Sequence, residues 1–267
     1  MNPSAEPRTS DAPKGSRRVP ILGVAVNAID LETAVETVAG WIRSREKTYV
    51  CVTPVAGIMA CQRDGDLRRI FNASGMTTPD GTPVVWVLRL LGESGVGRVY
   101  GPDLVRAVCR SSTAEGWRHY FYGGEAGVAQ RMAARMRAEF PALTIAGAAS
   151  PPHDWDPMLD EGAALRAIND AQPDVVWVGL STPKQERWMA ARRPHLRASV
   201  LVGVGAAFDF LSGEKPQAPR WMHSAGLEWV FRLASEPRRL WRRYLIDNPL
   251  FVILVTMQLL GLRRSVK

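Results

Sequence analysis

An acidic residue in a tight turn, Asp80, is the first candidate for chemistry in this chain. It stands in the hexapeptide TTPDGT (residues 77–82), directly before an apolar helical pattern over residues 84–91. A Pro-Asp-Gly turn also forms without any function, because Gly accepts a positive φ and the Asp side chain hydrogen-bonds to the nearby backbone. The helix that follows favours a second interpretation: a carboxylate at the ligand edge of a sheet that accepts a proton from a hydroxyl nucleophile.

A second candidate follows the apolar run Val175–Leu180, which predicts a strand buried on both faces, as in a parallel sheet. The run breaks into a polar turn, and a helix is predicted to open at Pro183. Lys184, Gln185 and Glu186 then lie at the carboxyl end of a strand and at a helix N-terminus, where α/β sheets bind phosphorylated ligands. The pattern indicates a site for an anionic small molecule.

Two glycine pairs follow predicted strands. Gly123 and Gly124 come after the strand His119–Tyr122, and Gly203 and Gly205 interrupt a later apolar run. Glycines at such positions let backbone N–H groups approach a diphosphate, and an ordinary strand-to-helix turn explains them equally well. A complete GxGxxG with its ribose-binding acid is missing, which argues against a nucleotide-dependent oxidoreductase.

Two Asp-x-Asp triplets, Asp64/Asp66 and Asp154/Asp156, have the spacing of a metal-binding pair beside a nucleotide diphosphate. Neither closely follows a buried strand, so a solvated or helix-capping role is favoured for both and no metal site is assigned. Asp209 is interpreted as a helix-start residue rather than a catalytic one.

Apolar runs alternate with helical patterns along the chain, which predicts an α/β fold with a Rossmann-like, mostly parallel sheet flanked by helices. One helix is predicted after an N-cap at Asp30, and another from residue 128 to 140. The expected strands are Ile21–Val26, Thr48–Thr53, His119–Tyr122, Thr144–Ala148, Val175–Leu180 and Ser199–Val204.

Composition divides the chain into three parts. Residues 1–20 are polar and lack the apolar core of a signal peptide, so a disordered leader is expected. Residues 21–213 form the predicted catalytic body, and residues 214–267 form a basic helical appendage within a chain of net charge +8. The three scattered cysteines indicate a reducing compartment rather than a disulfide framework.

The appendage combines arginines with tryptophans, and Arg220, Arg232 and Arg238 are candidate phosphate ligands. Its apolar end, Pro249–Leu262, spans about 21 Å as a helix, which is short of the roughly 30 Å hydrocarbon core of a bilayer. It is therefore expected to lie in the interface of an anionic membrane, with a core or oligomer-interface helix as the alternative. The long apolar end fits a bilayer better than nucleic acid.

These segments occur together and in an order that resembles the WecG/TagA/CpsF glycosyltransferase family over about residues 20–245. The segments PKQE (183–186) and GLEW (226–229) are the most specific. The other matching positions are Thr53, Pro79–Gly81, Gly123, Gly124, Gly179–Thr182, Trp188, Gly203–Gly205, Phe208, Asp209, Gly213, Ala218, Pro219, Arg232, Leu233 and Glu236–Arg238.

The resemblance implies an inverting, metal-independent enzyme without a cofactor, which transfers a sugar from a UDP-sugar. The acceptor is a polyprenyl-diphosphate-linked sugar at the cytoplasmic face of the bacterial inner membrane. The products are precursors of teichoic acids, common antigen, capsules or exopolysaccharides. By the family pattern Asp80 is the general base, Thr53 lines the same pocket and Gln185 contacts the donor. Lys184, Glu186 and the glycines at 123, 124, 203 and 205 lie on the donor side, and the appendage arginines steady the diphosphate.

Two positions depart from the family pattern: Val55, where many members have Asn, and Gln217, where many have Arg. Both differences are expected to bear on sugar specificity, and the resemblance assigns no donor sugar. The alternatives are a metal-dependent glycosyltransferase that uses Asp64 and Asp66, and a non-catalytic, membrane-associated subunit of a polysaccharide assembly complex. A homo-oligomer with the apolar end buried between subunits also remains open.

Overall fold

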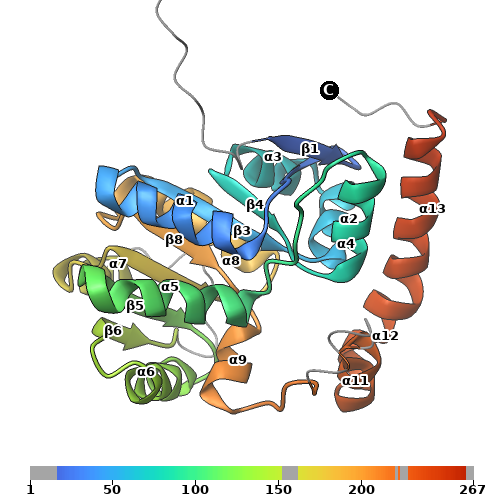
Figure 1. Cartoon of the computed structure of the whole chain (residues 1–267). Coiled ribbons are helices and arrows are strands. Elements are labelled where there is room, and N and C mark those ends of the chain that lie inside the picture. The colour runs from blue at the N-terminus through green and yellow to red at the C-terminus, as the bar shows by residue number, and fades with distance from the viewer. Residues whose placement is uncertain (1–16, 152–161, 220–221, 223–227, 263–267) are drawn as a thin grey trace, which may run out of the picture.

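A six-stranded parallel sheet forms the centre of the computed structural model, which describes residues 17–151, 162–219, 222 and 228–262 (Figure 1). The strand order is β4-β3-β8-β7-β5-β6, and every neighbouring pair is parallel. The strands are β3 Thr48–Thr53, β4 Met76–Pro79, β5 Arg118–Gly123, β6 Thr144–Ala149, β7 Val175–Gly179 and β8 Val200–Gly203. The predicted Rossmann-like parallel sheet is confirmed.

Helices cover both faces of this sheet. Alternate residues of a strand point to opposite faces, and in β7 the side chains of Val176 and Val178 join one apolar core while Trp177 joins the other. The helices of the body are α1 Leu31–Ser44, α2 Val55–Arg63, α3 Gly65–Ala73, α4 Thr82–Leu90, α5 Gly101–Glu115, α6 Val128–Glu139, α7 Ala163–Asp170, α8 Lys184–Arg192 with a 3-10 turn at Arg193–His195, and α9 Ala207–Ser212.

Several local predictions are confirmed. The Asp30 side chain accepts a hydrogen bond from the Thr33 amide at 2.9 Å and caps α1, and Asp64 caps α3 through the Leu67 amide at 2.9 Å. Helix α8 begins at Lys184, directly after Pro183. In α9 Asp209 lies in the first turn, where its carboxylate pairs with Lys215 at 2.9 Å.

The prediction of one strand at residues 21–26 is wrong, because the chain folds there into an antiparallel hairpin outside the main sheet. Its strands are β1 Arg18–Ile21 and β2 Val24–Asn27. The turn places Leu22 and Gly23 in the left-handed region, with φ of 50° and 81°. Strand β1 takes in residues 18–20 of the expected leader, of which residues 1–16 lie outside the described part.

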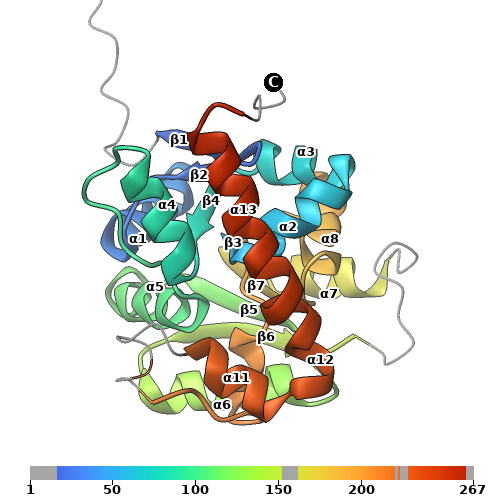
Figure 2. The ribbon, with the colours of Figure 1, turned by 90° about the vertical axis from the view of Figure 1, so that its right-hand side faces the viewer.

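The appendage consists of α11 Glu228–Ser235, α12 Pro237–Arg242, a π-helical turn at Arg243–Asp247 and α13 Asn248–Leu259. Helix α13 lies across the body and packs on α2, with Phe251 and Val255 buried (Figure 2). Near its end Gln258 accepts a hydrogen bond from the Leu22 amide at 2.7 Å and donates one to the Pro20 carbonyl at 2.8 Å, which joins α13 to the hairpin.

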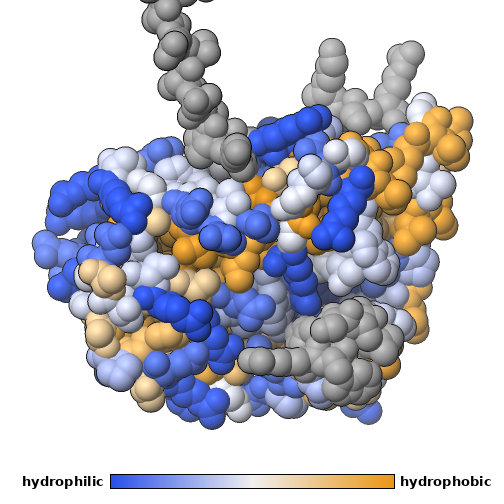
Figure 3. Space-filling view, viewed as in Figure 1, coloured by the Kyte–Doolittle hydropathy of each residue, from blue (hydrophilic) through white to orange (hydrophobic). Residues whose placement is uncertain are grey.

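The outer side of α13 remains apolar, and Figure 3 shows this apolar surface along the edge of the molecule where α13 lies. Its exposed large side chains are Leu250, Val252, Ile253, Met257 and Leu259, followed by Leu260 and Leu262. No helix within the described ranges has the length and apolar character needed to cross a bilayer.

Candidate active site

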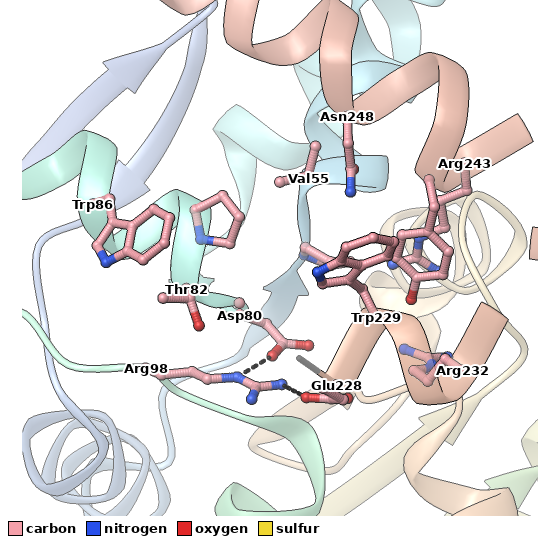
Figure 4. A pocket seen from close by; sticks show the side chains of 14 residues that line it. Val55, Asp80, Thr82, Trp86, Arg98, Glu228, Trp229, Arg232, Arg243 and Asn248 are labelled. Carbon is pink, nitrogen blue, oxygen red and sulfur yellow. Dashed lines mark hydrogen bonds and ion pairs between the residues drawn. The ribbon is translucent and has the colours of Figure 1, made fainter. Parts of the chain in front are cut away.

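Asp80 lies at the floor of a cavity of about 230 Å³ between α4 and the appendage (Figure 4). We call it the α4–α13 cavity. One wall comes from the start of α4, and the facing wall comes from α11, the π-helical turn and the first residue of α13. It is lined by Pro54, Val55, Asp80, Gly81, Thr82, Pro83, Trp86, Arg98, Glu228, Trp229, Arg232, Arg243, Tyr244 and Asn248.

A second cavity of about 290 Å³ lies at the carboxyl ends of β3, β7 and β8, and we call it the sheet-edge cavity. It shares Pro54, Asp80, Arg232 and Arg243 with the first. Its other lining residues are Val52, Ala56, Gly57, Ala60, Tyr100–Pro102, Ser181, Thr182, Gln185, Val204–Ala207, Phe210, Arg239, Leu240 and Asp247. Asp80 therefore lines two adjoining cavities.

The backbone around Asp80 explains its position. Strand β4 pairs with β3 up to Thr53 and Pro79, and the Asp80 amide donates to the Thr53 carbonyl at 3.1 Å. Gly81 follows with a φ of 110° and serves as the N-cap of α4. A side chain at 81 would be strained at that φ, so the PDG turn ends the strand and places Asp80 at the carboxyl-terminal edge of the sheet.

An ion-pair chain joins Asp80 to the appendage. The Arg98 Nε atom lies 3.3 Å from an Asp80 oxygen, and Arg98 Nη2 lies 2.7 Å from a Glu228 oxygen (Figure 4). Burial raises the pKa of the Asp80 carboxyl above its ordinary value, the charge of Arg98 opposes this, and the charge of Glu228 reinforces it. Asp80 is thus a carboxylate with enhanced basicity, since a higher pKa strengthens proton affinity.

The ion pairs of Arg98 predict opposite shifts of the Asp80 pKa for two substitutions. Arg98→Gln removes the cation that lowers the Asp80 pKa, so the acidic limb of kcat/KM against pH is expected to move to higher pH. Glu228→Gln removes a carboxylate that raises this pKa, so the limb is expected to move to lower pH. Rate–pH profiles of the three proteins measure both shifts. Equal limbs in all three would show that the ionisation that controls kcat/KM is not that of Asp80.

Cationic side chains converge where the two cavities meet. Arg232 and Arg243 line both, and Arg239 lines the sheet-edge cavity. The Arg232 guanidinium lies 5.5 Å from the centre of the Phe210 ring. Burial and the neighbouring charge of Arg232 lower the pKa of Arg243. Crowded guanidinium groups at a cavity wall are well suited to a diphosphate, which offers several anionic oxygens for bidentate hydrogen bonds.

Gln185 is a predicted donor-side residue whose side chain lines the sheet-edge cavity. It is buried, and its Oε1 atom has no hydrogen-bond partner among the described residues. Its Nε2 atom donates to Glu186 at 2.9 Å, and Thr182 Oγ1 donates to the same carboxylate at 2.8 Å. Glu186 thus fixes the orientation of Gln185, whose free oxygen can accept a hydrogen bond from a ligand.

The remaining predicted residues lie around the cavities rather than on their walls, except Gly205, which lines the sheet-edge cavity. Gly203 lies beneath Gln185, because a Cβ there would come within 3.2 Å of its amide carbon. Thr53 is buried and donates to the Cys51 carbonyl at 2.8 Å. The side chains of Lys184 and Arg238 are exposed outside both linings.

Gly123 and Gly124 hold two strand ends together. The Gly124 amide donates to the Gly179 carbonyl at 2.9 Å, and neither glycine lines the two cavities. Arg220 and the pair Asp154/Asp156 lie outside the described residues.

The Asp64/Asp66 pair is engaged in other interactions. Asp64 caps α3 and pairs with Arg187, and Asp66 pairs with Arg69. About 15 Å of helix α2 separates Asp64 from Pro54 at the cavities. Within the described ranges no three His, Cys, Asp or Glu side chains cluster in a way that could hold a metal ion.

Arg98 and the aromatic residues Trp86 and Tyr244 were not expected at the site, and Arg239 and Arg243 were expected only as part of the basic appendage. Each comes from an element whose sequence shows only a basic or apolar helix or loop. Val55 lines the α4–α13 cavity, so its departure from the family pattern changes the site itself. Glu228 and Trp229 stand in the GLEW motif, which was the one local signal for this wall.

Comparison with known proteins shows the family of this chain. Residues 19–265 match the model of the glycosyl transferase WecG/TagA/CpsF family. Two relatives are named N-acetylglucosaminyldiphosphoundecaprenol N-acetyl-beta-D-mannosaminyltransferase. The one from Bacillus subtilis (strain 168) is 30% identical over 186 residues, or 70% of each chain. The one from Bacillus spizizenii (strain ATCC 23059 / NRRL B-14472 / W23) is 31% identical over 196 residues, 73% of this chain and 74% of its own. The chain belongs to the WecG/TagA/CpsF family of glycosyltransferases.

Proposed function

We propose that this glycosyltransferase moves a sugar from a UDP-sugar to a sugar carried on a polyprenyl diphosphate, with inversion and with Asp80 as general base. One observation carries the proposal: Asp80 lies between two adjoining cavities that share Arg232 and Arg243. A sugar transfer between two diphosphate-bearing substrates needs such an arrangement, with a base at the junction and cations near both diphosphates.

The sheet-edge cavity is the proposed donor site. Carboxyl ends of parallel strands are the usual nucleotide site in α/β folds, and the free Oε1 of Gln185 is available to a donor hydroxyl or amide. Arg239 and Arg243 provide positive charge for the leaving diphosphate. Gly205 lets the β8–α9 turn approach the donor, and Thr53 supports Asp80 through its carbonyl.

The α4–α13 cavity is the proposed acceptor site. Trp86, Trp229 and Tyr244 line it, and their flat apolar rings can pack on the C–H face of a sugar. The acceptor hydroxyl then lies near Asp80, while Arg232 and Arg243 contact the acceptor diphosphate.

The proposed step is a single displacement. The acceptor hydroxyl oxygen attacks the anomeric carbon of the donor from the side opposite UDP and loses its proton to Asp80. The bond between the anomeric carbon and the UDP oxygen breaks at the same time, and UDP leaves with the electron pair. One displacement inverts the anomeric centre and needs no covalent enzyme intermediate. The arginines stabilise the charge that grows on UDP, so we propose that no metal is required.

The names of the two relatives suggest the first substrates to test. Both name an N-acetylmannosaminyl group as transferred and N-acetylglucosaminyl diphosphoundecaprenol as acceptor. We propose the same acceptor class for this chain, and a donor panel that also contains glucose and uronic acid derivatives because Val55 changes the cavity wall.

UDP release from a panel of UDP-sugars, with and without a short-chain lipid-diphosphate N-acetylglucosamine, tests the proposal. Acceptor-dependent release with one donor, unchanged by EDTA, is the expected result. Loss of release on chelation would instead favour a metal-dependent enzyme. UDP release by Asp64→Asn and Asp66→Asn would then show whether these two carboxylates hold the metal. No release with any donor would favour a non-catalytic subunit of an assembly complex.

We further propose that the appendage docks on the cytoplasmic face of the inner membrane. Helix α13 is apolar around its circumference and exposes Val252 and Ile253, with basic residues elsewhere in the appendage. Deletion of residues 246–267 is expected to abolish co-sedimentation with phosphatidylglycerol vesicles.

The point variant Val252→Glu/Ile253→Glu is the matched control for folding, since both side chains already face solvent. It is expected to lose vesicle binding while its thermal unfolding stays unchanged. Vesicle binding that persists in both variants would contradict membrane docking by α13. An oligomer interface would then explain the exposed apolar side of α13.

A further inference from the structure

The catalytic body exposes large apolar side chains at one place. Among its described residues these are Trp86, which is 58% exposed, and Leu90, which is 71% exposed, and both belong to α4. They stand four residues apart, so they lie on the same face of the helix. All other exposed large apolar side chains in the described part of the chain belong to the appendage. Exposed apolar surface confined to one helix face is typical of a binding surface.

This face begins at the candidate active site. Trp86 lines the α4–α13 cavity, and Leu90 lies one turn farther along α4. From Thr82 at the cavity to Leu90 the helix rises about 12 Å. The facing wall has the same arrangement, because Asn248 lines the cavity and Val252, 61% exposed, follows one turn later on α13. We call Trp86, Leu90 and Val252 the apolar path.

Both helices begin at the cavity, and in Figure 4 Trp86 and Asn248 flank the space above Asp80 from opposite sides. Figure 2 shows α4 beside α13 on the face that the apolar helix crosses. An apolar chain attached to a ligand in the cavity therefore has side chains to contact on both flanks where it leaves.

The chemistry of the proposed acceptor matches this path, and the inference rests on the proposed function. With its sugar at Asp80 and its diphosphate at Arg232 and Arg243, the acceptor must direct its hydrocarbon chain out of the cavity. We propose that Trp86 and Leu90, with Val252, bind the isoprenoid units next to the diphosphate of the lipid-linked acceptor. The enzyme would thus recognise the hydrocarbon chain of the acceptor directly, in addition to its sugar and its diphosphate.

A bilayer is the other hydrocarbon that could cover this face. The substrate chain is favoured because Trp86 belongs to both the cavity wall and the path, so the path starts at the site itself. Apart from Val252, the exposed apolar side chains of α13, among them Ile253 and Leu259, are available to the bilayer.

Calorimetric titration with two acceptors tests the proposal without turnover. Both carry the same diphosphate N-acetylglucosamine, one on a farnesyl chain and one on a propyl group. The wild type is expected to bind the farnesyl compound more tightly. Leu90→Ala is expected to reduce this preference about fivefold, since apolar contact area is lost. Trp86→Ala should reduce it about tenfold, and Leu90→Met should keep it within about twofold because its apolar surface remains.

An unchanged preference in Leu90→Ala, or a wild type without preference, would overturn the proposal. Co-sedimentation of Leu90→Ala with acceptor-free phosphatidylglycerol vesicles is expected to equal that of the wild type. A loss there with an unaltered chain preference would assign α4 to the bilayer and also overturn it. A wild type that prefers the farnesyl compound but transfers no sugar would refute the proposed function and leave the chain-binding path standing.

Discussion

Asp80→Asn is expected to lower kcat for acceptor-dependent UDP release by about 10²–10⁴-fold, the usual contribution of a general base. Asn has nearly the same shape, but its amide cannot take a proton from the acceptor hydroxyl at neutral pH. Burial and Glu228 raise the proton affinity of the native carboxylate, so the substitution removes a base of enhanced strength. Initial rates at saturating donor and acceptor give the change in kcat.

The control for this variant is Asp66→Asn, which removes a carboxylate that pairs with Arg69 outside both cavities. Its kcat should equal that of the wild type. Donor binding by Asp80→Asn, measured by calorimetry, is expected to remain, which would separate a chemical defect from a misfolded site. A kcat within about threefold of the wild type would refute the assignment of Asp80 as the base.

Gly123→Ala is expected to lower the free energy of unfolding by about 3 kcal/mol or more, from backbone strain and overpacking together. Gly123 has a φ of 139°, and a Cβ there would lie 2.6 Å from the carbonyl carbon and oxygen of Gly179 in the neighbouring strand. Both partners of this clash are backbone, so no side chain can move aside. Urea unfolding followed by circular dichroism measures the loss.

Gly40→Ala provides the matched control with the opposite sign. Gly40 lies within α1, is exposed, and has nothing within 4 Å of a new Cβ. Alanine there should raise the free energy of unfolding by about 0.5–1 kcal/mol, because glycine disfavours a helix interior. If Gly123→Ala were as stable as the wild type, the β5–β7 contact at the end of the sheet would have to be looser than described.

Strands with continuous apolar runs could be predicted from the sequence, because burial on both faces leaves a clear pattern. Strand β7 is the clearest case, and the helix after it began within one residue of its expected position. Strand β4 was missed because its sequence MTTP looks like a turn. Its Thr77 is buried only because Arg18, Ser74 and the Phe71 carbonyl satisfy its hydroxyl, and these partners are set by the fold.

The hairpin was missed for a different reason. Its turn places Leu22 in the left-handed region, a conformation that leucine rarely adopts, so the residue type gives no signal for a turn at this position. Gln62 donates a hydrogen bond to the Leu22 carbonyl, and the Leu22 amide donates one to Gln258, so both backbone groups of the turn are held. The tertiary contacts thus override the local preference, and a pattern of apolar residues cannot reveal this.

At the site, the sequence located the residues that follow strand ends, such as Asp80 and Gln185. Parallel strands bring such positions to one edge whatever the surrounding loops do. Arg98, in the loop before α5, contacts Asp80, and Arg243, in the π-helical turn of the appendage, lines the same cavities. The tertiary fold alone brings them to the site, so no local pattern marks them. The family resemblance pointed to the appendage arginines as a group but did not distinguish Arg243 or Arg239 from Arg238.

The ion-pair chain from Asp80 through Arg98 to Glu228 has a consequence for shortened forms of the protein. All six strands of the sheet precede residue 228. A polypeptide that ends before residue 228 contains Asp80 and Arg98 but lacks Glu228 and the arginines at 232, 239 and 243. Under the proposed function such a fragment has no appendage cation with which to stabilise a departing diphosphate.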